Sequence, residues 1–521
     1  MSMEVQKAVH AEFRRHGLSL RRDSVKLVAA YVDDQHVSVE DAAELMLNAL
    51  EKQELKSTIL DVETVEKLIG DLLEGVVQDD SATHVIGAFD MPKFNYDPIK
   101  KAFYKVSTKP DMFGDANAKI SLYQERLMIL RNRVSRNKLF AKPSFELSSS
   151  RREYCELTSV QGLMGLYGET KYLLGVLTEI EDGNLFIEDM TGTIKVEMVN
   201  AIPTTGLFTE NCIIIAEGQL REDGVFALSY MGFPMLESRL DFRAATGNEN
   251  FFGGANIRIE DFAQLEDQER TAEADMFVIL SDVWLDIPNT FTRLRSVFHG
   301  FSSVEVVPSL FVFMGDYSSQ PHHIIQTDYS IMKGHFDALA ELICEFPRLT
   351  EGSQFVFMPG PNDPSPSPAL PRPPLPMSLT TALSDRIPRA QFTSNPCRIR
   401  YYTQEIVLMR EALQHRMMRF ARRPPVTEET DSMFEHLATT LIQQGHLCPL
   451  PISVQPIYWE YDYALRLYSP PHALVLADFT EQASFAYKDA DCNCFNPGSF
   501  GDKGVFAAYR PAARAVEMCS V

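Results

Sequence analysis

Asp275-Met-Phe-Val-Ile-Leu-Ser-Asp-Val-Trp-Leu-Asp286 and Leu310-Phe-Val-Phe-Met-Gly-Asp316 are the stretches that decide the expected fold. Two short apolar runs each end in an acidic residue and are separated by an amphipathic segment, which predicts a β-α-β unit. Parallel strands bring the residues after their carboxyl ends to the same edge of a sheet. The pattern therefore places Asp282 and Asp316 side by side, as the carboxylates of a metal site are placed.

The same pattern continues downstream. Phe355-Val-Phe-Met leads into Pro359-Gly-Pro-Asn-Asp363, and Ala473-Leu-Val-Leu-Ala leads into Asp478. His446 follows a predicted helix and is either a further candidate ligand or a hydrogen-bonded core histidine. The residues that the sequence assembles into one candidate site are Asp282, Asp316, Asp363, His446 and Asp478.

This order of blocks resembles the calcineurin-like phosphoesterases, whose metal-binding blocks are Asp-x-His, Gly-Asp-x-x-Asp, Gly-Asn-His-Asp/Glu, a lone His and Gly-His-x-His. Here Trp284 stands where the first His belongs, and Ser319 stands where the Asp of the second block belongs. Pro361 and Asn362 lie in the sequence that replaces Gly-Asn-His-Asp. An indole cannot ligate a metal and proline has no side-chain donor. The resemblance therefore implies the fold with a degenerate site, without catalytic residues, metal or cofactor.

Composition limits the function further. The 521 residues suffice for two or three domains, and their hydrophobic fraction is typical of soluble globular proteins. No apolar run is long enough for a membrane span or a secretion signal. The net charge of −22 argues against a surface that grips phosphate backbones, so we expect DNA binding to be weak or indirect at most.

The eight cysteines are scattered, which indicates reduced thiols in the cytosol or nucleus. Cys492-Asn-Cys494 is the tight pair among them. Without a second such pair it is a weak zinc candidate, and ordinary thiols on a loop are the alternative.

Residues 1–75 carry apolar side chains at helical spacing, such as Val5, Val9 and Phe13. The spacing predicts four short helices that form an N-terminal helical bundle. An acidic stretch at 78–81 follows, so residues 76–154 are expected to be a linker and an irregular or helical connecting segment. The alternative is that the first helices cap the main body. Residues 122–139 predict a basic helix whose arginines either face solvent or form a binding surface.

Residues 155–240 are expected to form an OB-fold barrel. Five short apolar strands alternate with glycine-containing turns, with a longer excursion before the fourth strand. OB barrels can bind single-stranded nucleic acid through aromatic side chains on a basic face. The acidic side chains expected on these strands would instead repel phosphates, which favours a protein-contacting role: Glu179, Glu188, Asp189 and Glu197.

Residues 255–521 are expected to form the inactive phosphoesterase-like domain, an αβ sandwich. Its internal loop at 359–376 is rich in proline. Pro371-Arg-Pro-Pro-Leu-Pro376 resembles a polyproline ligand for an SH3-type groove, and a loop fixed against the sheet is the alternative. The fold class predicted is thus multidomain α+β.

A second resemblance covers essentially the whole length. The chain resembles the B-subunits of replicative DNA polymerases, in the branch that serves DNA polymerase epsilon. The N-terminal stretch Phe13-Arg-Arg-His-Gly-Leu-Ser-Leu-Arg-Arg22 is similar to the domain particular to that branch. The other motifs that carry the resemblance are Asn250-Phe-Phe-Gly-Gly254, Ser281-Asp-Val-Trp-Leu-Asp286, Gly445-His-Leu447, Trp459-x-Tyr-Asp-Tyr-Ala-Leu-Arg466 and Asn496-Pro-Gly-Ser-Phe500.

The resemblance implies a nuclear, non-catalytic accessory subunit acting in DNA replication. It implies that the OB and phosphoesterase-like domains hold the zinc-binding C-terminal region of the catalytic subunit of DNA polymerase epsilon. It also implies that residues 1–75 dock on the GINS part of the replicative helicase. Two alternatives remain open. One is a metal-dependent phosphoesterase or nuclease using Asp282, Asp316, Asp363 and His446, and the other is a single-strand DNA-binding OB protein.

Overall fold

The computed structural model describes most of residues 82–521, with gaps at 142–153, 182, 248, 255–256, 258 and 322–328. Before residue 82 it describes residues 9–10, 13–15, 18–35, 46, 59–60, 62 and 65. The chain divides into two compact units, one of residues 1–81 with 255–258 and the other of residues 82–254 with 259–521. The second unit holds every candidate site residue.

The first unit includes a helix and a pair of short strands. Helix α2 (Arg22–Gln35) buries Val25, Val28 and Tyr31 along one side. Strand β1 (Ser19–Leu20) pairs in parallel with β2 (Ile59–Leu60), a contact that helical periodicity did not predict. The other helices expected in residues 1–75 lie largely outside the described residues.

The first six-stranded sheet of the second unit contains the expected β-α-β pattern. Its strand order is β15-β14-β13-β12-β21-β22. The parallel strands are β12 (Phe277–Ser281), β13 (Leu310–Met314), β14 (Gln354–Met358) and β15 (Ala390–Phe392). The antiparallel strands are β21 (Val505–Arg510) and β22 (Ala515–Ser520). Because Ser281 is the register partner of Met314, β12 and β13 end at the same level of the sheet.

The second six-stranded sheet has the order β19-β20-β18-β17-β16-β3. Its strands are β3 (Thr83–Gly87), β16 (Cys397–Tyr401), β17 (Gln404–Arg410), β18 (Ala473–Ala477), β19 (Ala483–Tyr487) and β20 (Cys492–Asn496). Strands β17, β18 and β20 run parallel to one another. The carboxyl ends of β17 and β18 therefore also meet at one edge.

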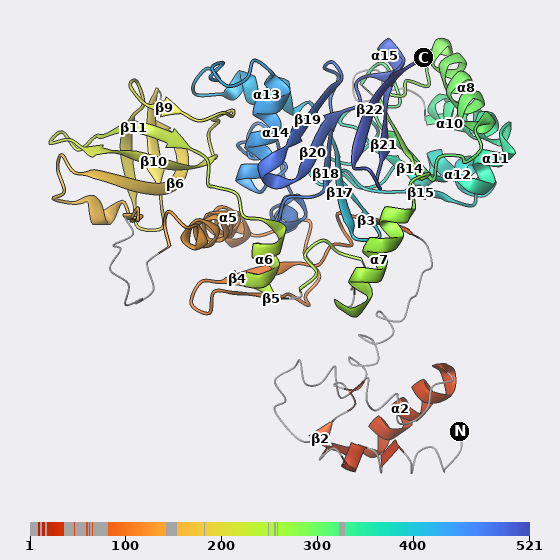
Figure 1. The fold of residues 1–521 in the computed structure, drawn as a ribbon, viewed down its shortest axis with the longest axis horizontal. Helices are drawn as coiled ribbons and strands as arrows, with labels where there is room; N and C mark the ends of the chain where they lie inside the picture. Colours follow the sequence, from red (N-terminus) through yellow and green to blue (C-terminus); the bar gives the residue numbers. More distant parts are fainter. Residues whose placement is uncertain are drawn as a thin grey trace. The chain divides into compact units, whose positions relative to one another are not determined.

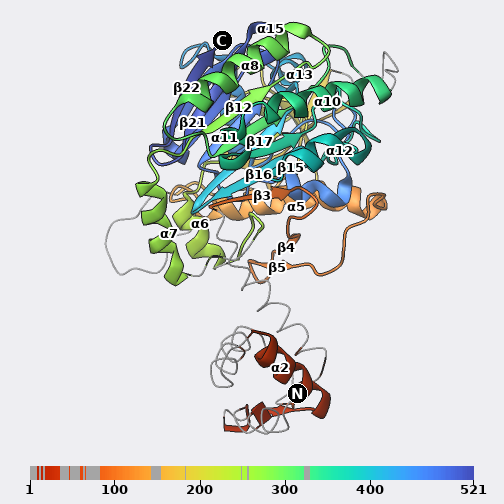
Figure 2. The ribbon, with the colours of Figure 1, turned by 90° about the vertical axis from the view of Figure 1, so that its right-hand side faces the viewer.

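The two sheets pack face to face, because most of their strands are apolar on both faces. Alternate residues such as Ile279 of the first sheet and Leu408 of the second meet in a shared core. The outer face of the first sheet carries α8 (Pro288–Ser303), α10 (Tyr329–Cys344), α11 (Pro347–Gly352) and α12 (Met377–Arg386) (Figure 2). The outer face of the second carries α13 (Leu413–Phe420) and α14 (Met433–Gln444) (Figure 1). This mixed α/β body therefore has four layers.

A barrel lies beside α14, on the side away from the second sheet (Figure 1). Its strands are β6 (Thr170–Glu181), β7 (Asn184–Glu188), β8 (Thr193–Glu197), β9 (Ile202–Pro203), β10 (Ile213–Leu220) and β11 (Phe226–Gly232). The pairing of β10 with β11 closes the sheet. The five strands expected between residues 155 and 240 are all present, and β9 is an additional short one.

The segment expected to be a linker contributes to the body. Strand β3 pairs with β16, and β4 (Phe94–Asp97) forms a hairpin with β5 (Ala102–Lys105). Helix α5 (Ala116–Arg136) packs on the barrel, burying Leu127 and Leu130 against β6 and β10. The described part of residues 76–154 is thus built into the second unit rather than free.

Short helices complete the second unit: α6 (Arg239–Thr246), α7 (Ile259–Thr271), the 3-10 helix η2 (Trp459–Leu465) and α15 (Phe500–Lys503). Within the part of the chain that is described, none of the helices combines the length and apolar character needed to cross a membrane. The prolines of the loop at 359–376 do not form a free ligand, since Arg372 is buried and exchanges backbone hydrogen bonds of 2.7 and 3.0 Å with Asn395.

Candidate functional site

Three of the predicted aspartates meet at the carboxyl edge of the first sheet. Asp282 follows β12, Asp316 follows β13 and Asp363 lies in the loop after β14, and all three are buried. The Asp316 N–H donates to Asp282 Oδ1 at 3.3 Å. Asp363 accepts from the N–H groups of Tyr317 and Gly360, both at 2.8 Å. The structure thus brings these three aspartates together at the edge where the strand-end pattern placed Asp282 and Asp316.

The cation in this cluster is an arginine that the sequence analysis did not single out. Arg410 ends β17 and lies in the second sheet. Its Nε and Nη2 donate to Asp282 Oδ1 at 3.0 and 2.6 Å, and Nη2 lies 3.3 Å from Asp316 Oδ2. The Arg410 side chain is 3% exposed, so the pairs are screened little by water. One guanidinium therefore bridges the two carboxylates that the strand-end pattern placed side by side.

The charges of this cluster depend on one another. Burial alone would lower the pKa of Arg410, but Asp282 and Asp316 outweigh it and hold the pKa above its usual value. Burial raises the pKa of Asp316, with Arg410 opposing. Burial, together with the charge of Asp316, raises the pKa of Asp363 to about 7. A carboxyl group that keeps its proton near neutral pH is a poor metal ligand.

Asp478 lies at the neighbouring strand end of the second sheet. It follows β18, and its Oδ2 accepts from the Gln414 N–H at 3.3 Å. Burial raises the pKa of Asp478, and the charge of Arg410 opposes the rise. Arg410 therefore acts on the carboxylates of both sheets.

Asn362 and Ser319, which the sequence analysis compared with ligand positions of another family, donate hydrogen bonds to aspartates. Asn362 donates from its backbone N–H to Asp316 Oδ1 at 2.9 Å and from Nδ2 to Asp316 Oδ2 at 2.8 Å, with Pro361 preceding it. Ser319 donates to Asp286 from its N–H at 2.9 Å and from Oγ at 2.5 Å. Asp316 and Asp286 are thus satisfied by hydrogen-bond donors.

Trp284, two residues after Asp282, lies against Gly501, the residue that directly follows the Asn496–Phe500 motif. A Cβ atom on Gly501 would lie 2.6 Å from Trp284 Cδ2 and 2.7 Å from the Asp282 carbonyl oxygen. Only a glycine lets the start of α15 approach the indole this closely. Trp284 therefore has a packing contact with the start of α15.

His446 does not join the aspartates. It lies in a separate buried network, where Nε2 is 3.1 Å from Asp462 Oδ1 and Nδ1 accepts from the Cys448 N–H at 3.0 Å. Burial, followed by the charge of Arg126, lowers the pKa of His446 to about 4. His446 is therefore a neutral, hydrogen-bonded core histidine in this structure.

The network around His446 comes from the motif at Trp459–Arg466 and from α5. Asp462 accepts from Arg126 Nε at 3.1 Å and from Arg466 Nε at 2.9 Å. Burial raises the pKa of Asp462, but the charges of Arg126, His446 and Arg466 hold it well below its usual range. The basic helix expected at 122–139 is thus not a solvated face here, because Arg126 and Arg133 are buried. Nothing in the sequence spacing indicated this pairing.

The donor set does not fit a metal. Among the described residues, no group of three or more His, Cys, Asp or Glu side chains is arranged to hold an ion. Asp282 and Asp316 already share Arg410, and His446 lies elsewhere. Cys492 and Cys494 are buried with their Sγ atoms 3.8 Å apart. Their surroundings in the described structure supply no third ligand.

Known protein families match successive parts of the sequence. Residues 277–487 match the family of the B subunits of DNA polymerases alpha and epsilon. Residues 116–235 match the OB-fold domain of proteins like DNA polymerase epsilon subunit 2, and residues 1–72 match the N-terminal domain of the DNA polymerase epsilon proteins. The second match confirms the OB fold of the barrel and includes α5, which packs on it.

Relatives match along nearly the whole chain. The B subunit of DNA polymerase epsilon from Arabidopsis thaliana is 42% identical, with 99% of each chain covered. The DNA polymerase epsilon subunit 2 of Homo sapiens is 38% identical, with 97% of this chain and 96% of the human protein covered. Identity and coverage at this level show that the chain belongs to the family of DNA polymerase epsilon B subunits.

Proposed function

We propose that this chain is a non-catalytic accessory subunit of DNA polymerase epsilon that acts in the nucleus during chromosomal replication. Relatives named as that subunit align with this chain over nearly their whole length. The single observation that supports a non-catalytic role is Arg410, whose guanidinium pairs with both Asp282 and Asp316. Two-metal hydrolysis needs these carboxylates to bind ions roughly 3.5–4 Å apart. A guanidinium offers neither a Lewis acid nor a metal-bound water.

An activity assay tests this role. Pure protein with manganese and a nucleic-acid or nitrophenyl-phosphate substrate should give no turnover above buffer, and EDTA should change nothing. The alternative of a phosphoesterase using Asp282, Asp316, Asp363 and His446 requires turnover that is lost in D282N and D316N. Metal-dependent activity with that mutational pattern would overturn the non-catalytic proposal.

We further propose that the barrel and the four-layer body together form one binding surface, called the seat below, for the zinc-binding C-terminal region of the catalytic subunit. Several contacts join the two parts. Gln444 of α14 accepts from the Ile213 N–H at 2.8 Å and donates to the Ile213 carbonyl at 2.7 Å, continuing the ladder of β10. Arg422 contacts Glu179 of the barrel at 2.5 Å. These contacts support a rigid seat that spans both parts.

Exposed apolar side chains on the barrel support the presence of a partner. Ile202 and Tyr230 are register partners on neighbouring strands, and both are more than half exposed, at 57% and 52%. Other exposed apolar residues of the barrel are Met164, Tyr167, Ile180, Val199 and Met190. A partner surface that covers them removes apolar area from water.

A truncation series tests the seat. A truncation near residue 155 would remove β3 and α5, which are part of the second unit. The truncation that leaves this unit intact therefore begins at residue 82. Residues 82–521 should bind the C-terminal region of the catalytic subunit as tightly as the full chain. Undiminished binding by residues 259–521, which lack the barrel and β3, would argue against a shared seat.

Residues 1–75 are proposed to dock on the GINS part of the replicative helicase. The division of the chain near residue 81 supports a separable role for this segment. Deleting residues 1–81 should leave the polymerase complex assembled and reduce helicase association in a pull-down. If helicase association is unchanged by the deletion, these residues serve another purpose.

The OB barrel does not favour a single-strand DNA-binding function. Arg422 pairs with Glu179, and Arg221 pairs with Glu197. These two arginines at the barrel therefore already have carboxylate partners within the chain. Binding to a fluorescent oligonucleotide should be weak at about 150 mM salt, the physiological ionic strength. A tight complex with a steep salt dependence would support the DNA-binding alternative.

A further inference from the structure

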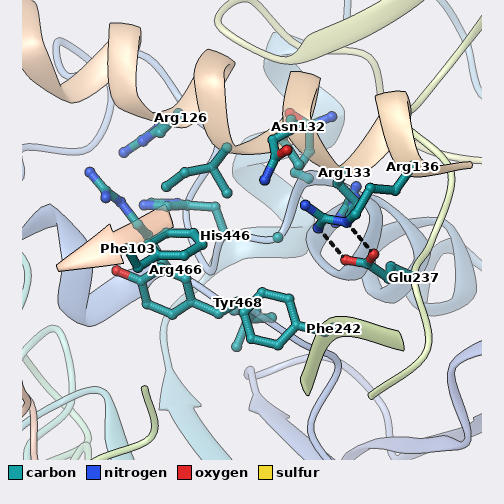
Figure 3. A pocket seen from close by; sticks show the side chains of 15 residues that line it. Phe103, Arg126, Asn132, Arg133, Arg136, Glu237, Phe242, His446, Arg466 and Tyr468 are labelled. Carbon is teal, nitrogen blue, oxygen red and sulfur yellow. Dashed lines mark hydrogen bonds and ion pairs between the residues drawn. The ribbon is translucent and has the colours of Figure 1, made fainter. Parts of the chain in front are cut away.

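A small pocket lies where α5, the end of the barrel and the C-terminus of α14 meet (Figure 3). Its volume is about 30 Å³. Arg126, Arg133 and Arg136 of α5 line one side, with Glu237, His446 and Arg466 among the residues around them. The pocket is separate from the aspartate cluster at the sheet edge, because none of its lining residues belongs to that cluster.

The charges around this pocket do not cancel. Arg126 and Arg466 share Asp462, and Arg466 Nη2 also pairs with Glu125 at 2.8 Å. Arg136 pairs with both oxygens of Glu237, at 2.6 and 2.5 Å. His446 adds no charge at neutral pH, since its pKa is about 4. Four arginines therefore face three carboxylates, which leaves one positive charge on Arg133.

Arg133 is the arginine of this pocket without a carboxylate partner among the described residues. Its side chain is 8% exposed, and Nη2 donates to the carbonyl oxygens of Pro234, at 3.1 Å, and Gln443. Its buried Nε–H makes no hydrogen bond within the described structure. Burial lowers the pKa of Arg133 to about 10, and the charge of Glu237, which is itself paired with Arg136, opposes this fall only in part.

The carbonyl partners offset only part of this charge. Gln443 belongs to the last turn of α14, and a helix C-terminus carries a partial negative charge of roughly half a unit. An arginine that is buried in this way costs free energy unless a full negative charge lies nearby. The pocket is the space beside Arg133 in which such a charge can sit.

We propose that this pocket binds one free, small monovalent anion of chloride size, held mainly by Arg133. Its volume exceeds the roughly 10–15 Å³ that a single water needs, and it is too small for a phosphate with its hydration shell. A single negative charge balances the single surplus positive charge. Apolar walls formed by Leu130, Phe242 and Leu467 favour a weakly hydrated ion such as chloride or bromide over a strongly hydrated one.

The position of the pocket gives the anion a structural role. Arg133 joins three parts of the second unit, because it lies on α5 and bonds Pro234 at the end of the barrel and Gln443 on the body. An anion beside Arg133 stabilises the joint between the barrel and the body. Chloride is thus expected to stabilise the barrel and the body in the arrangement that forms the proposed binding surface.

Thermal unfolding of the full chain in chloride tests the proposal. Sodium chloride replaces sodium gluconate at constant ionic strength, since gluconate is too large for the pocket. A chloride concentration ten times the Kd shifts the folding equilibrium about elevenfold, which raises the Tm by roughly 1–2 °C for a unit of this size. In R133M, which keeps a side chain of similar length without the charge, the Tm should not respond to chloride.

A matched control separates this effect from general salt effects. Arg293 also donates to carbonyl oxygens at a helix end, those of Phe500, Gly501 and Asp502, but lines no part of the pocket. R293M should keep the chloride response of the wild type. An equal chloride response in wild type and R133M would overturn the proposal, as would no response in wild type.

Crystals of the wild-type chain grown in bromide give a second measurement that does not depend on a folded variant. An anomalous peak within hydrogen-bonding distance of Arg133 Nε supports the site. A pocket that contains only water in bromide overturns it.

Discussion

Arg410 Nη2 donates to Asp282 Oδ1 across 2.6 Å and thereby joins the end of β17 in one sheet to the end of β12 in the other. The same nitrogen lies 3.3 Å from Asp316 Oδ2. The two carboxylates follow neighbouring strands of the first sheet, and the guanidinium comes from the second sheet. One buried side chain therefore ties the two sheets together at this edge.

Removing this guanidinium should destabilise the second unit. R410M leaves Asp282 and Asp316 buried and unpaired, so the free energy of unfolding should fall by about 3–5 kcal/mol in a denaturant titration. Adding D282N should recover part of the loss, because one uncompensated charge is then gone. R270M serves as the control, since the Arg270–Asp267 pair is exposed and should change stability by less than about 1 kcal/mol. An R410M protein as stable as wild type would refute the role of Arg410.

The raised pKa of Asp363 predicts a stability that depends on pH. In the folded chain the pKa is about 7, whereas in the unfolded chain it is near 3.8. The folded state therefore binds one more proton between these values, so stability should fall as pH rises through this window, by at most about 1.4 kcal/mol per pH unit. D363N cannot titrate and should give a flatter profile. Parallel profiles for the two proteins would contradict the assignment.

Asp462 should be more important for stability than an ordinary surface carboxylate. D462N removes the charge that Arg126 and Arg466 share, and it alters the hydrogen bond to His446. Because these partners are buried, the free energy of unfolding should fall by about 3–5 kcal/mol. D267N, in the exposed pair with Arg270, is the matched control and should be nearly neutral. Similar unfolding midpoints for the two variants would contradict this network.

The joint between barrel and body should depend on one glutamine. Q444L leaves the buried N–H and carbonyl of Ile213 without partners, and each such group costs about 1–3 kcal/mol. The neighbouring Q443L removes a single side-chain bond, to the Tyr487 hydroxyl, and should cost about 1 kcal/mol. Hydrogen exchange at the start of β10 should rise in Q444L only. Equal exchange in both variants would argue against the joint.

Close packing on Trp284 predicts a steric effect of one methyl group. G501A places a Cβ against the indole and the Asp282 backbone, so it should lower the free energy of unfolding by about 1–3 kcal/mol. Gly300, within α8, has no atom within 4 Å of an added Cβ. G300A should therefore be neutral or stabilising by up to about 1 kcal/mol. A neutral G501A would mean that the start of α15 can move away from the indole.

The sequence could place Asp282 and Asp316 together because a few neighbouring residues are enough to recognise the end of each strand. Asp282 and Asp316 each follow an apolar run, and parallel register alone brings two such positions together. Arg410 was not predicted, since a charged residue after an apolar run looks the same whether it faces water or a neighbouring sheet. Its partner Asp282 lies 128 residues away in the chain. Only the packing of one sheet on the other determines that they meet.

The same limit explains the other differences. The order of the chain left His446 as either a ligand or a hydrogen-bonded core histidine. Its partner Asp462 belongs to a motif whose spacing gives no sign of the contact. Strand β3 was assigned to a linker because the short segment Thr83–Gly87, with two apolar side chains after an acidic stretch, has no sequence feature that specifies a partner strand. Its pairing with β16 depends on a free sheet edge formed by residues roughly 300 positions later.

Arg410 has a consequence for how the cell maintains this subunit. A metal ion has to be acquired after synthesis, competes with other ions and can be removed by a chelator. The guanidinium of Arg410 is translated with the chain and stays charged at any pH that a cell experiences. The positive charge that joins Asp282 and Asp316 is therefore present as soon as the chain folds, and a chelator cannot remove it.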